Sequence, residues 1–301
     1  MSLLEVTDVA KSYGPVVALR SADLSVEPGE VHALMGANGA GKSTLVKILT
    51  GVIARDSGEI AVDGKPVTIG SPKAARAVGL APVFQDPALL PDLTVAQNLR
   101  LTSADVARVS AELERMGLTV DLTALVSELP LPTLRMLDLA RALSYEPQLL
   151  LLDEITASLP SDLADTVTGI VRDFRESGRS VLFISHRLAE VSALCDRATV
   201  LRDGHAVGTL VPRAGEEERM VELMLGQSRD TLAAGVEAAT DSDAEVAAVQ
   251  TEAEPGKPVL EVRALRLEGQ PGEGVDFEVR AGEIVGVAAL EGQGQDELFA
   301  L

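Results

Sequence analysis

The chain has 301 residues, of which 46% are apolar and only 2% aromatic, so Leu, Val, Ile and Ala must build a core that is large enough for two domains. The formal net charge of −20 argues against a general nucleic-acid-binding surface, and no nucleic-acid partner is expected. Cys195 is the single cysteine and excludes an intrachain disulfide, and no apolar run approaches a membrane span, so a membrane role would need a partner protein.

The first part of the chain is predicted to place short strands around one strand–loop–helix unit. No signal-peptide pattern follows Met1. Turn residues such as Gly14-Pro15 and Asp63-Gly64 separate runs of alternating hydrophobicity. The predicted strands are residues 3–9, 16–19, 24–27, 30–35, 59–62, 66–69 and 79–84. A helix is predicted from Lys42 to Thr50.

Helices and strands alternate again after a helical region. Residues 95–145 are predicted to be mostly helical, with Ser103 as the N-cap of the segment that ends at Met116. The later predicted elements are strands 149–152 and 180–184, helix 162–176, a hairpin over 198–210 and helix 216–225. This alternation predicts an α/β fold for residues 1–228.

Residues 36–43 fit the pattern G-x-x-x-x-G-K-[ST], a loop whose backbone N–H groups surround the phosphates of a nucleotide. Glycines allow the close approach, and the N-terminus of the following helix supplies a fixed positive end. Lys42 adds a mobile charge, and the hydroxyl of Ser43 can ligate Mg²⁺. The residues expected to contact the nucleotide are Gly36, Asn38, Gly39, Ala40, Gly41, Lys42, Ser43 and Thr44.

Further polar residues follow three predicted strands. Gln85 can contact Mg²⁺ or the attacking water, Asp153 is placed beside the metal, and Glu154 can polarise water. His186 follows strand 180–184 and lies at the same sheet edge, where ligands bind in such folds. Tyr13 either stacks on the base or only packs. His32 and His205 are expected to be structural.

The composition changes after residue 228, and the opening pattern then returns. Residues 229–257 are expected to be an acidic flexible linker or a weak Ala-rich helix. Residues 279–284 repeat residues 26–31, and the same offset of 253 places Gln295 on Lys42 and Asp296 on Ser43. Residues 258–301 therefore read as the first part of a duplicated domain, which makes the chain look truncated.

Together these motifs make the chain resemble the ATP-binding subunits of ABC transporters. The resemblance covers residues 1–228 and the fragment from residue 258. It implies a P-loop NTPase fold of the ABC type, with a mixed-sheet core, a helical subdomain around residues 87–145 and the start of a second copy. It also implies roles for four residues, which match the family's Q-loop, Walker B pair and switch histidine: Gln85, Asp153, Glu154 and His186.

The chain departs from the family at the signature motif, which is Leu-Ser-Gly-Gly-Gln or close to it. Residues 129–133 occupy that place, before a helix expected over residues 136–143. They include Pro130 and Pro132, which have no N–H and no hydroxyl to bind a phosphate. In the family, two nucleotide domains pair head to tail, so this segment would face the altered loop around Gln295. We therefore expect one competent and one degenerate ATP site in the full-length tandem protein.

The arrangement looks most like tandem ATPases that power the import of monosaccharides and similar small polar solutes. Residues 84–86, 93–98, 220–226 and 292–298 also resemble that subfamily. The implied partners are a transmembrane permease and, indirectly, an extracytoplasmic solute-binding protein, with the ATPase at the cytoplasmic face of the membrane. The isolated fragment is expected to be weakly active. The alternatives are a nucleoside importer, a ribosome-associated tandem ATPase and a regulatory ATP clamp.

Overall fold

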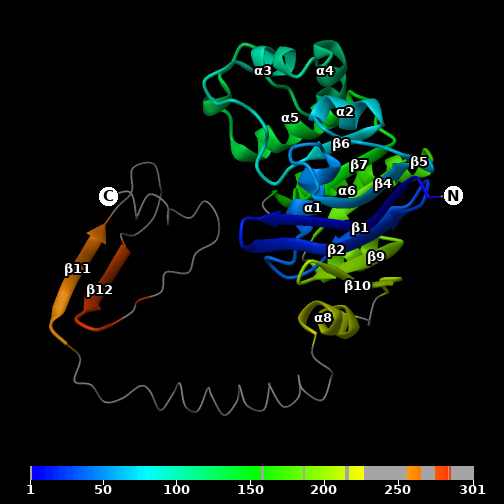
Figure 1. Cartoon of the computed structure of the whole chain (residues 1–301). Helices are drawn as coiled ribbons and strands as arrows, with labels where there is room; N and C mark the ends of the chain where they lie inside the picture. Colours follow the sequence, from blue (N-terminus) through cyan, green and yellow to red (C-terminus); the bar gives the residue numbers. More distant parts are fainter. Residues whose placement is uncertain are drawn as a thin grey trace. The chain divides into compact units, whose positions relative to one another are not determined.

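The computed structural model describes residues 2–156, 159–185, 187–213, 217–226, 256–265, 275–283 and 285. It separates into two compact units, Met1–Arg229 and Asp230–Leu301, and each is described by itself (Figure 1). Three predictions lie outside the described residues: the role of His186, the linker apart from Gly256 and Lys257, and the altered loop at Gln295 and Asp296. No helix in the described ranges is long and apolar enough to cross a membrane.

The first unit is built on a ten-stranded mixed sheet with the order β5-β4-β1-β2-β10-β9-β3-β8-β7-β6. The strands are β1 (Leu4–Tyr13), β2 (Val16–Val26), β3 (Val31–Met35), β4 (Ser57–Val62), β5 (Lys65–Pro66), β6 (Leu80–Val83), β7 (Leu149–Asp153), β8 (Ser180–Ile184), β9 (Arg197–Arg202) and β10 (His205–Leu210). The helices are α1 (Lys42–Leu49), α2 (Pro72–Ala77), α3 (Val95–Leu101), α4 (Val106–Arg115), α5 (Leu131–Leu143), α6 (Ser161–Glu176), α7 (Leu188–Leu194) and α8 (Glu217–Leu225), with a 3₁₀ turn over Val126–Glu128.

The central strands are parallel and in register, which brings their carboxyl ends to one edge. Ile184 of β8 pairs with Leu34 of β3 on one side and with Asp153 of β7 on the other. On the far side of β7, Leu152 pairs with Val83 of β6. The residues that follow β3, β6, β7 and β8 therefore leave the sheet at the same level.

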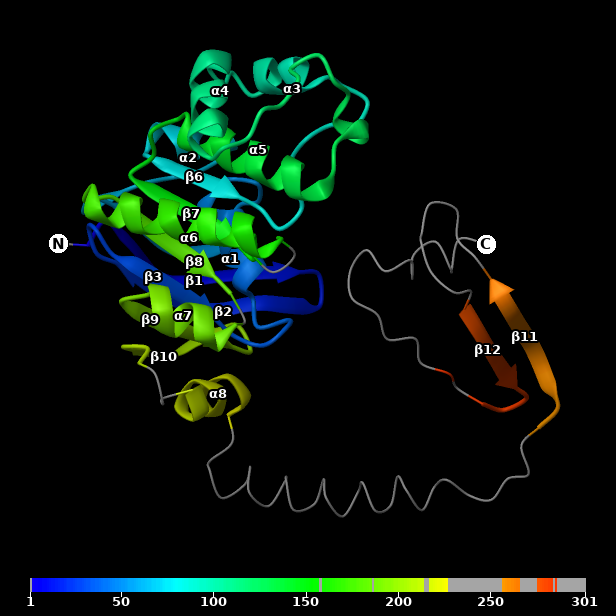
Figure 2. The same cartoon turned by 180° about the vertical axis from the view of Figure 1, so that it is seen from behind.

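Alternate residues of the central strands contribute side chains to two separate apolar cores, because successive side chains point to opposite faces of a sheet. Leu150 and Leu152 belong to the cluster that contains α5 and α6, whereas Leu149 and Leu151 belong to the cluster that contains α1 and the β1–β2 face. Figure 2 shows α6 and α7 in front of the sheet. The helices α3, α4 and α5 form a helical layer beside β6 at one end of the unit (Figure 1).

Several predicted boundaries were wrong in detail. The two strands predicted over 16–19 and 24–27 form the single strand β2, and the strand predicted over 66–69 is reduced to β5. Ser103 is not a helix cap: it has φ of 56°, and α4 is capped instead by Asp105, whose carboxylate accepts the N–H groups of Ala107 and Arg108. A carboxylate is as good a cap as a hydroxyl, so the local pattern did not decide between them.

The second unit contains an antiparallel pair, β11 (Pro258–Leu265) and β12 (Val275–Arg280). Leu260 pairs with Val279 as Leu4 pairs with Val26 in the first unit, and the next two pairs correspond in the same way. The sequence Leu-Glu-Val begins the matching part of both hairpins. The two strand pairs therefore share one register, as expected if residues 258–301 begin a second copy of the first fold.

Candidate nucleotide-binding site

The loop of residues 36–41 connects β3 to α1. At each of its two ends, only glycine fits without a steric clash. At Gly36, with φ of 151°, an added Cβ would lie 2.3 Å from the carbonyl oxygen of Leu201. At Gly41, with φ of 106°, it would lie 2.5 Å from Leu19 Cδ2 and 2.7 Å from the carbonyl oxygen of Ala18. The glycines of the sequence pattern are thus required by backbone packing as well as by backbone conformation.

Lys42 begins α1 and folds back into the loop. Its Nζ donates to the carbonyl oxygen of Gly36 at 2.8 Å and of Ala37 at 3.2 Å, and the residue is only 6% exposed. Burial lowers the pKa of Lys42, and the nearby carboxylates of Glu154 and Asp153 oppose that shift. A buried ammonium group held in this way can exchange its carbonyl contacts for phosphate oxygens.

The N-terminus of α1 has the properties of an anion site. Its N-cap is Gly41, no described side chain caps it, and its first turn carries no acidic residue. The first-turn N–H groups and the helix dipole therefore remain directed toward an anionic ligand, next to Lys42. Ser43 and the loop residues Asn38 and Gly39 are exposed, whereas Ala40 is buried and Thr44 is half-buried. This donor set fits the phosphates of a nucleotide.

Asp153 and Glu154 follow β7 at the same edge. Burial and the neighbouring Glu154 raise the pKa of Asp153 to about 6, while Lys42 and Lys47 act in the opposite direction. Glu154 has φ of 51°, which is rare for a residue other than glycine, and its N–H donates to the carbonyl oxygen of Ile184 at 3.0 Å. Backbone strain of this kind is often retained where it orients a functional side chain.

Whether this site can hold Mg²⁺ depends on the phosphate oxygens of the nucleotide as well as on the protein side chains. Within the described ranges, no group of three or more His, Cys, Asp and Glu residues could hold a metal by itself. Mg²⁺ commonly takes only one or two protein ligands and completes its shell with water and phosphate oxygens. The Asp153 carboxylate at the end of β7 and the Ser43 hydroxyl in the first turn of α1, next to Lys42, fit that pattern.

Gln85 lies two residues after β6 and is exposed. Because β6 is in register with β7, the segment that carries Gln85 leaves the sheet beside the segment that carries Glu154. The sheet thus brings Lys42, Asp153, Glu154 and Gln85 to one edge, and their roles at a nucleotide stay predictions. His186 follows β8 in the chain and lies outside the described residues.

A polar cluster near that edge was not found from the sequence. Glu190, in the first turn of α7, accepts hydrogen bonds from Thr156 at 2.9 Å and from Ser185 at 3.1 Å, and Arg187 donates to it at 3.0 Å. Glu190 therefore ties the segment after β7 to the segment after β8. A glutamate in the first turn of a short helix is common, so its spacing gave no signal.

Tyr13 ends β1 and lies at the tip of the β1–β2 hairpin, while Ala18 and Leu19 of the same hairpin lie against Gly41 of the phosphate loop. The tyrosine is 46% exposed, with Lys11 Nζ at 5.7 Å from its ring centroid. An exposed ring can stack on a base. Base stacking by Tyr13 stays a prediction.

The segment in place of the signature motif forms the start of α5. This helix begins at Leu131, five residues earlier than the segment 136–143 that was expected, with Pro130 as N-cap and Pro132 inside the first turn. Proline is tolerated there because first-turn N–H groups have no partner within the helix. No described side chain caps the helix, and Leu131 is 42% exposed. Because Pro130 and Pro132 have no N–H and Leu131 is apolar, the N-terminus of α5 is a poor phosphate site.

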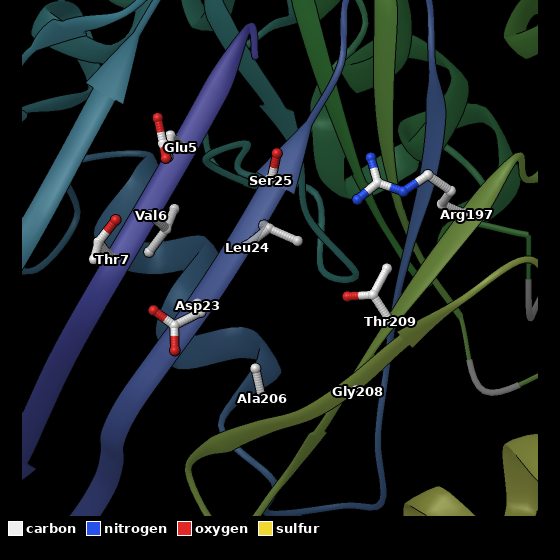
Figure 3. Close-up of a pocket in the computed structure, with 10 residues that line it drawn as sticks. All are labelled: Glu5, Val6, Thr7, Asp23, Leu24, Ser25, Arg197, Ala206, Gly208 and Thr209. Atoms are coloured by element: carbon white, nitrogen blue, oxygen red, sulfur yellow. The ribbon is translucent and has the colours of Figure 1, made fainter. Parts of the chain in front are cut away.

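A separate pocket of about 390 Å³ lies where β2 and β10 diverge beyond their single pairing, Ser21 with His205 (Figure 3). Acidic and polar side chains line it, among them Glu5, Asp23 and Thr209, together with Arg197. Its lining, within the part of the chain that the structure describes, includes none of the predicted site residues.

The comparisons with known proteins agree with this geometry. Residues 19–157 match the family model described as ABC transporter. The matched residues of the first unit are therefore those of an ABC transporter ATP-binding domain, and the fold is the α/β P-loop fold that was predicted. A solved ATP-binding cassette of an ABC transporter in its ADP conformation is 26% identical, with a TM-score of 0.63, and the match covers 75% of this chain and 100% of that chain. CbiO1 of Clostridium perfringens, part of an ABC transporter complex, is also 26% identical, with a TM-score of 0.59 over 75% and 96% of the two chains.

Curated relatives are more similar in sequence. "Ribose import ATP-binding protein RbsA 1" of Rubrobacter xylanophilus is 41% identical over 98% of this chain and 58% of its own length. "Ribose import ATP-binding protein RbsA 2" of Streptomyces coelicolor is 40% identical over 98% of this chain and 56% of its own length. The chain thus spans less than two thirds of the length of these relatives.

Proposed function

We propose that the protein is the ATP-binding and ATP-hydrolysing subunit of an importer, which powers uptake of a sugar or a similar small polar solute through a partner permease. One observation carries the ATPase part: the buried Lys42 ammonium lies inside a glycine loop and close to the Asp153 and Glu154 carboxylates. The ribose import relatives support a sugar as the solute class.

In this proposal the residues have distinct tasks. The loop N–H groups and Lys42 hold the phosphates, and Tyr13 stacks on the base. Ser43, Asp153 and Gln85 hold Mg²⁺, which when bound neutralises charge on the outer phosphates. Glu154 accepts a proton from the attacking water, and His186 and Gln85 complete the site around the outer phosphate.

The site also needs a partner surface. We infer that two nucleotide domains pair within the full-length protein and that the pair binds permease subunits at the cytoplasmic face of the membrane. A solute-binding protein outside the membrane would deliver the solute. Closure of the pair on ATP and its reopening after hydrolysis would drive transport.

The two composite sites are proposed to be unequal. The prolines at the start of α5 would face the altered loop at Gln295 and Asp296, so both losses would fall in one site. The Lys42 site would remain competent and would take its signature motif from the second domain. Single-turnover measurements on the full-length protein should therefore show one hydrolytic site, and two equivalent sites would contradict the proposal.

The first experiment is a gentle affinity purification of the full-length protein from its own cells, followed by mass spectrometry. A permease together with a solute-binding protein is the expected result, and the binding protein would then identify the solute, including a nucleoside. Recovery of ribosomal proteins without a permease would refute the transport function and leave the ATP site to be tested separately.

A further inference from the structure

The pocket of about 390 Å³ between β2 and β10 is a consequence of how these two strands meet. They pair only once, Ser21 with His205. Next to that pair, the carbonyl oxygen of Gly204 accepts the N–H groups of Arg20 at 2.9 Å and of Ser21 at 3.3 Å. A Cβ at Gly204 would lie 2.9 Å from the Arg20 nitrogen, so the strands are in close contact there. Beyond this fixed joint they diverge, and the pocket lies in the gap.

Two polar side chains extend into the pocket from β9 and β10. Figure 3 shows the guanidinium of Arg197 and the hydroxyl of Thr209 directed toward the strand that carries Leu24 and Ser25. Ser25 adds a second hydroxyl from that strand to the lining. A guanidinium is always charged and presents a fork of N–H donors that matches a carboxylate. This side of the pocket is therefore suited to a carboxylate group.

A buried chain of hydrogen bonds connects these two side chains behind the pocket. Thr209 Oγ1 lies 3.0 Å from Thr199 Oγ1, which lies 2.8 Å from His32 Nε2. His32 Nδ1 lies 2.9 Å from one carboxylate oxygen of Glu30, and Arg197 Nη1 lies 3.4 Å from the other. The three middle residues, Thr199, His32 and Glu30, are 2%, 0% and 6% exposed. Both ends of the chain line the pocket, and its middle does not.

This chain orients the two groups at its ends. A buried polar network is rigid when its members are bonded to one another. Glu30 accepts from one nitrogen of Arg197, Nη1, whereas a guanidinium has five N–H donors in all. Groups that are already ordered lose little conformational entropy when a ligand binds. The pocket thus presents a cation and a hydroxyl in fixed positions.

The opposite wall of the pocket is acidic. Glu5 of β1 and Asp23 of β2 line it and are exposed, and Figure 3 shows them across the gap from Arg197. Asp23 Oδ1 accepts the N–H of Asp8 at 3.0 Å, which orients that carboxylate. Two carboxylates repel a simple anion, and a guanidinium repels a simple cation. A ligand that carries both charges matches both walls, and a volume of this order suits a small molecule.

We propose that the pocket between β2 and β10 is a second small-molecule site, which binds a zwitterion of the amino-acid class. The carboxylate of the ligand binds to Arg197 and Thr209, and its ammonium group binds to the acidic wall. This binding requires no nucleotide and goes beyond the proposed ATPase function.

The test is isothermal titration of the nucleotide-free chain with each of the common amino acids as a separate probe. At least one is expected to bind with a Kd of about 1 mM or lower. For that amino acid, the analogue with a carboxamide and the analogue without the amine should each bind about tenfold more weakly, since each loses one charged contact. Absence of binding by every probe would overturn the proposal, and equal binding of the two analogues would refute the zwitterion.

Substitutions on the two walls locate the bound amino acid. Arg197→Met and Asp23→Asn should each weaken its binding about 10- to 100-fold, because each removes one charge partner. Asp23→Asn keeps an oxygen that can accept the N–H of Asp8. The control is Arg108→Met, which breaks an exposed pair with Glu146 in the helical layer and should leave the affinity unchanged. Full affinity in folded Arg197→Met and Asp23→Asn variants would overturn the proposal.

The contribution of the buried chain has its own test. Thr199→Val removes the hydroxyl between Thr209 and His32 and leaves the lining of the pocket unchanged. The amino acid should then bind about 2- to 10-fold more weakly, the value of roughly one hydrogen bond. If Thr199→Val fails to fold, Thr209→Val replaces it, because it removes the exposed end of the chain. Full affinity in the folded variant would refute the role of the chain.

The titration is also independent of the nucleotide site. A chain that binds no ATP analogue would refute the proposed function, and the amino-acid titration would still decide whether this pocket is a site. Conversely, a chain that binds the analogue and no amino acid would overturn only the inference about the pocket.

Discussion

Glu154 is the residue whose chemistry can be tested most directly. Its backbone is held at positive φ by the N–H bond to Ile184, so an isosteric change should leave the loop in place. We predict that Glu154→Gln keeps the affinity for ATP and loses about 10²- to 10⁴-fold in kcat, because an amide cannot accept the proton from water. Equilibrium titration with an ATP analogue and steady-state hydrolysis measure the two quantities. Unchanged hydrolysis would remove Glu154 as the base.

Arg135, on α5, is a buried cation whose hydrogen-bond donors are only partly satisfied by the described residues. It is 6% exposed, and its Nε and Nη1 atoms are fully buried with no hydrogen-bond partner among the described residues. We predict that Arg135→Met raises the free energy of unfolding by about 1–3 kcal/mol. The unpaired donors of Arg135 give up their hydrogen bonds to water on folding and gain none in the protein, and methionine has no such donors. Urea unfolding of the chain measures the change.

The comparison variant for Arg135 is Arg141→Met, on the same helix. It removes a guanidinium that does have partners and leaves Asp138 buried and unpaired, so it should destabilise the chain. Equal effects of the two substitutions would contradict this account of Arg135.

At the level of the elements, a buried network of hydrogen-bonded side chains connects the start of β3 to β9. Glu30 accepts from His32 Nδ1 at 2.9 Å and lies 3.4 Å from Arg197 Nη1, and His32 Nε2 contacts Thr199 Oγ1 at 2.8 Å. His32 is fully buried and bonded at both ring nitrogens, which fits the structural role expected for it. Burial alone would raise the pKa of Glu30, but the bonds to His32 and to the Glu27 N–H, with Arg197, lower it overall.

This lowered pKa fixes the sign of a pH dependence. The carboxylate of Glu30 stabilises the fold above the usual glutamate pKa, and that stability is lost as the pH falls through the lower folded value. We predict that Glu30→Gln costs about 1–3 kcal/mol at neutral pH and that the difference from the wild type shrinks below about pH 4. Urea unfolding across this range measures it, with Glu176→Gln on the exposed side of α6 as control. A difference that is constant with pH would contradict the prediction.

The boundaries of the elements also show why the sequence predicted the starts of helices less accurately than the strands. Strands β7 and β8 are short, apolar and bounded by polar residues, so the sequence predicted them within one residue. The start of α5 was placed too late, because two prolines in sequence normally argue against a helix. The first turn accepts them, and the buried residues from Arg135 to Leu143 supply the packing that holds the helix.

At the scale of the whole molecule, the first unit has its own apolar core. Among the residues that the structure describes, its two apolar clusters consist of residues between Leu3 and Met224, and the chain divides at Arg229. We predict that residues 1–228 alone keep the melting temperature of the first transition and the affinity for an ATP analogue that the whole chain shows. Calorimetry and titration of the two proteins test this. Loss of folding in residues 1–228 would show that the first unit depends on residues 229–301.

The sequence by itself determined the class of fold and the loop at which we propose that the phosphates bind. The glycine loop, Lys42 and the apolar strand before Asp153 are local patterns whose spacing leaves few structures that satisfy both backbone and burial. Only the tertiary structure decided which residues meet across the sheet: that Asp153 lies in register with Ile184, and that Arg141 reaches Ala88 from 53 positions away in the chain. Such contacts depend on how separate elements pack, and side chains that act only through packing carry no local pattern.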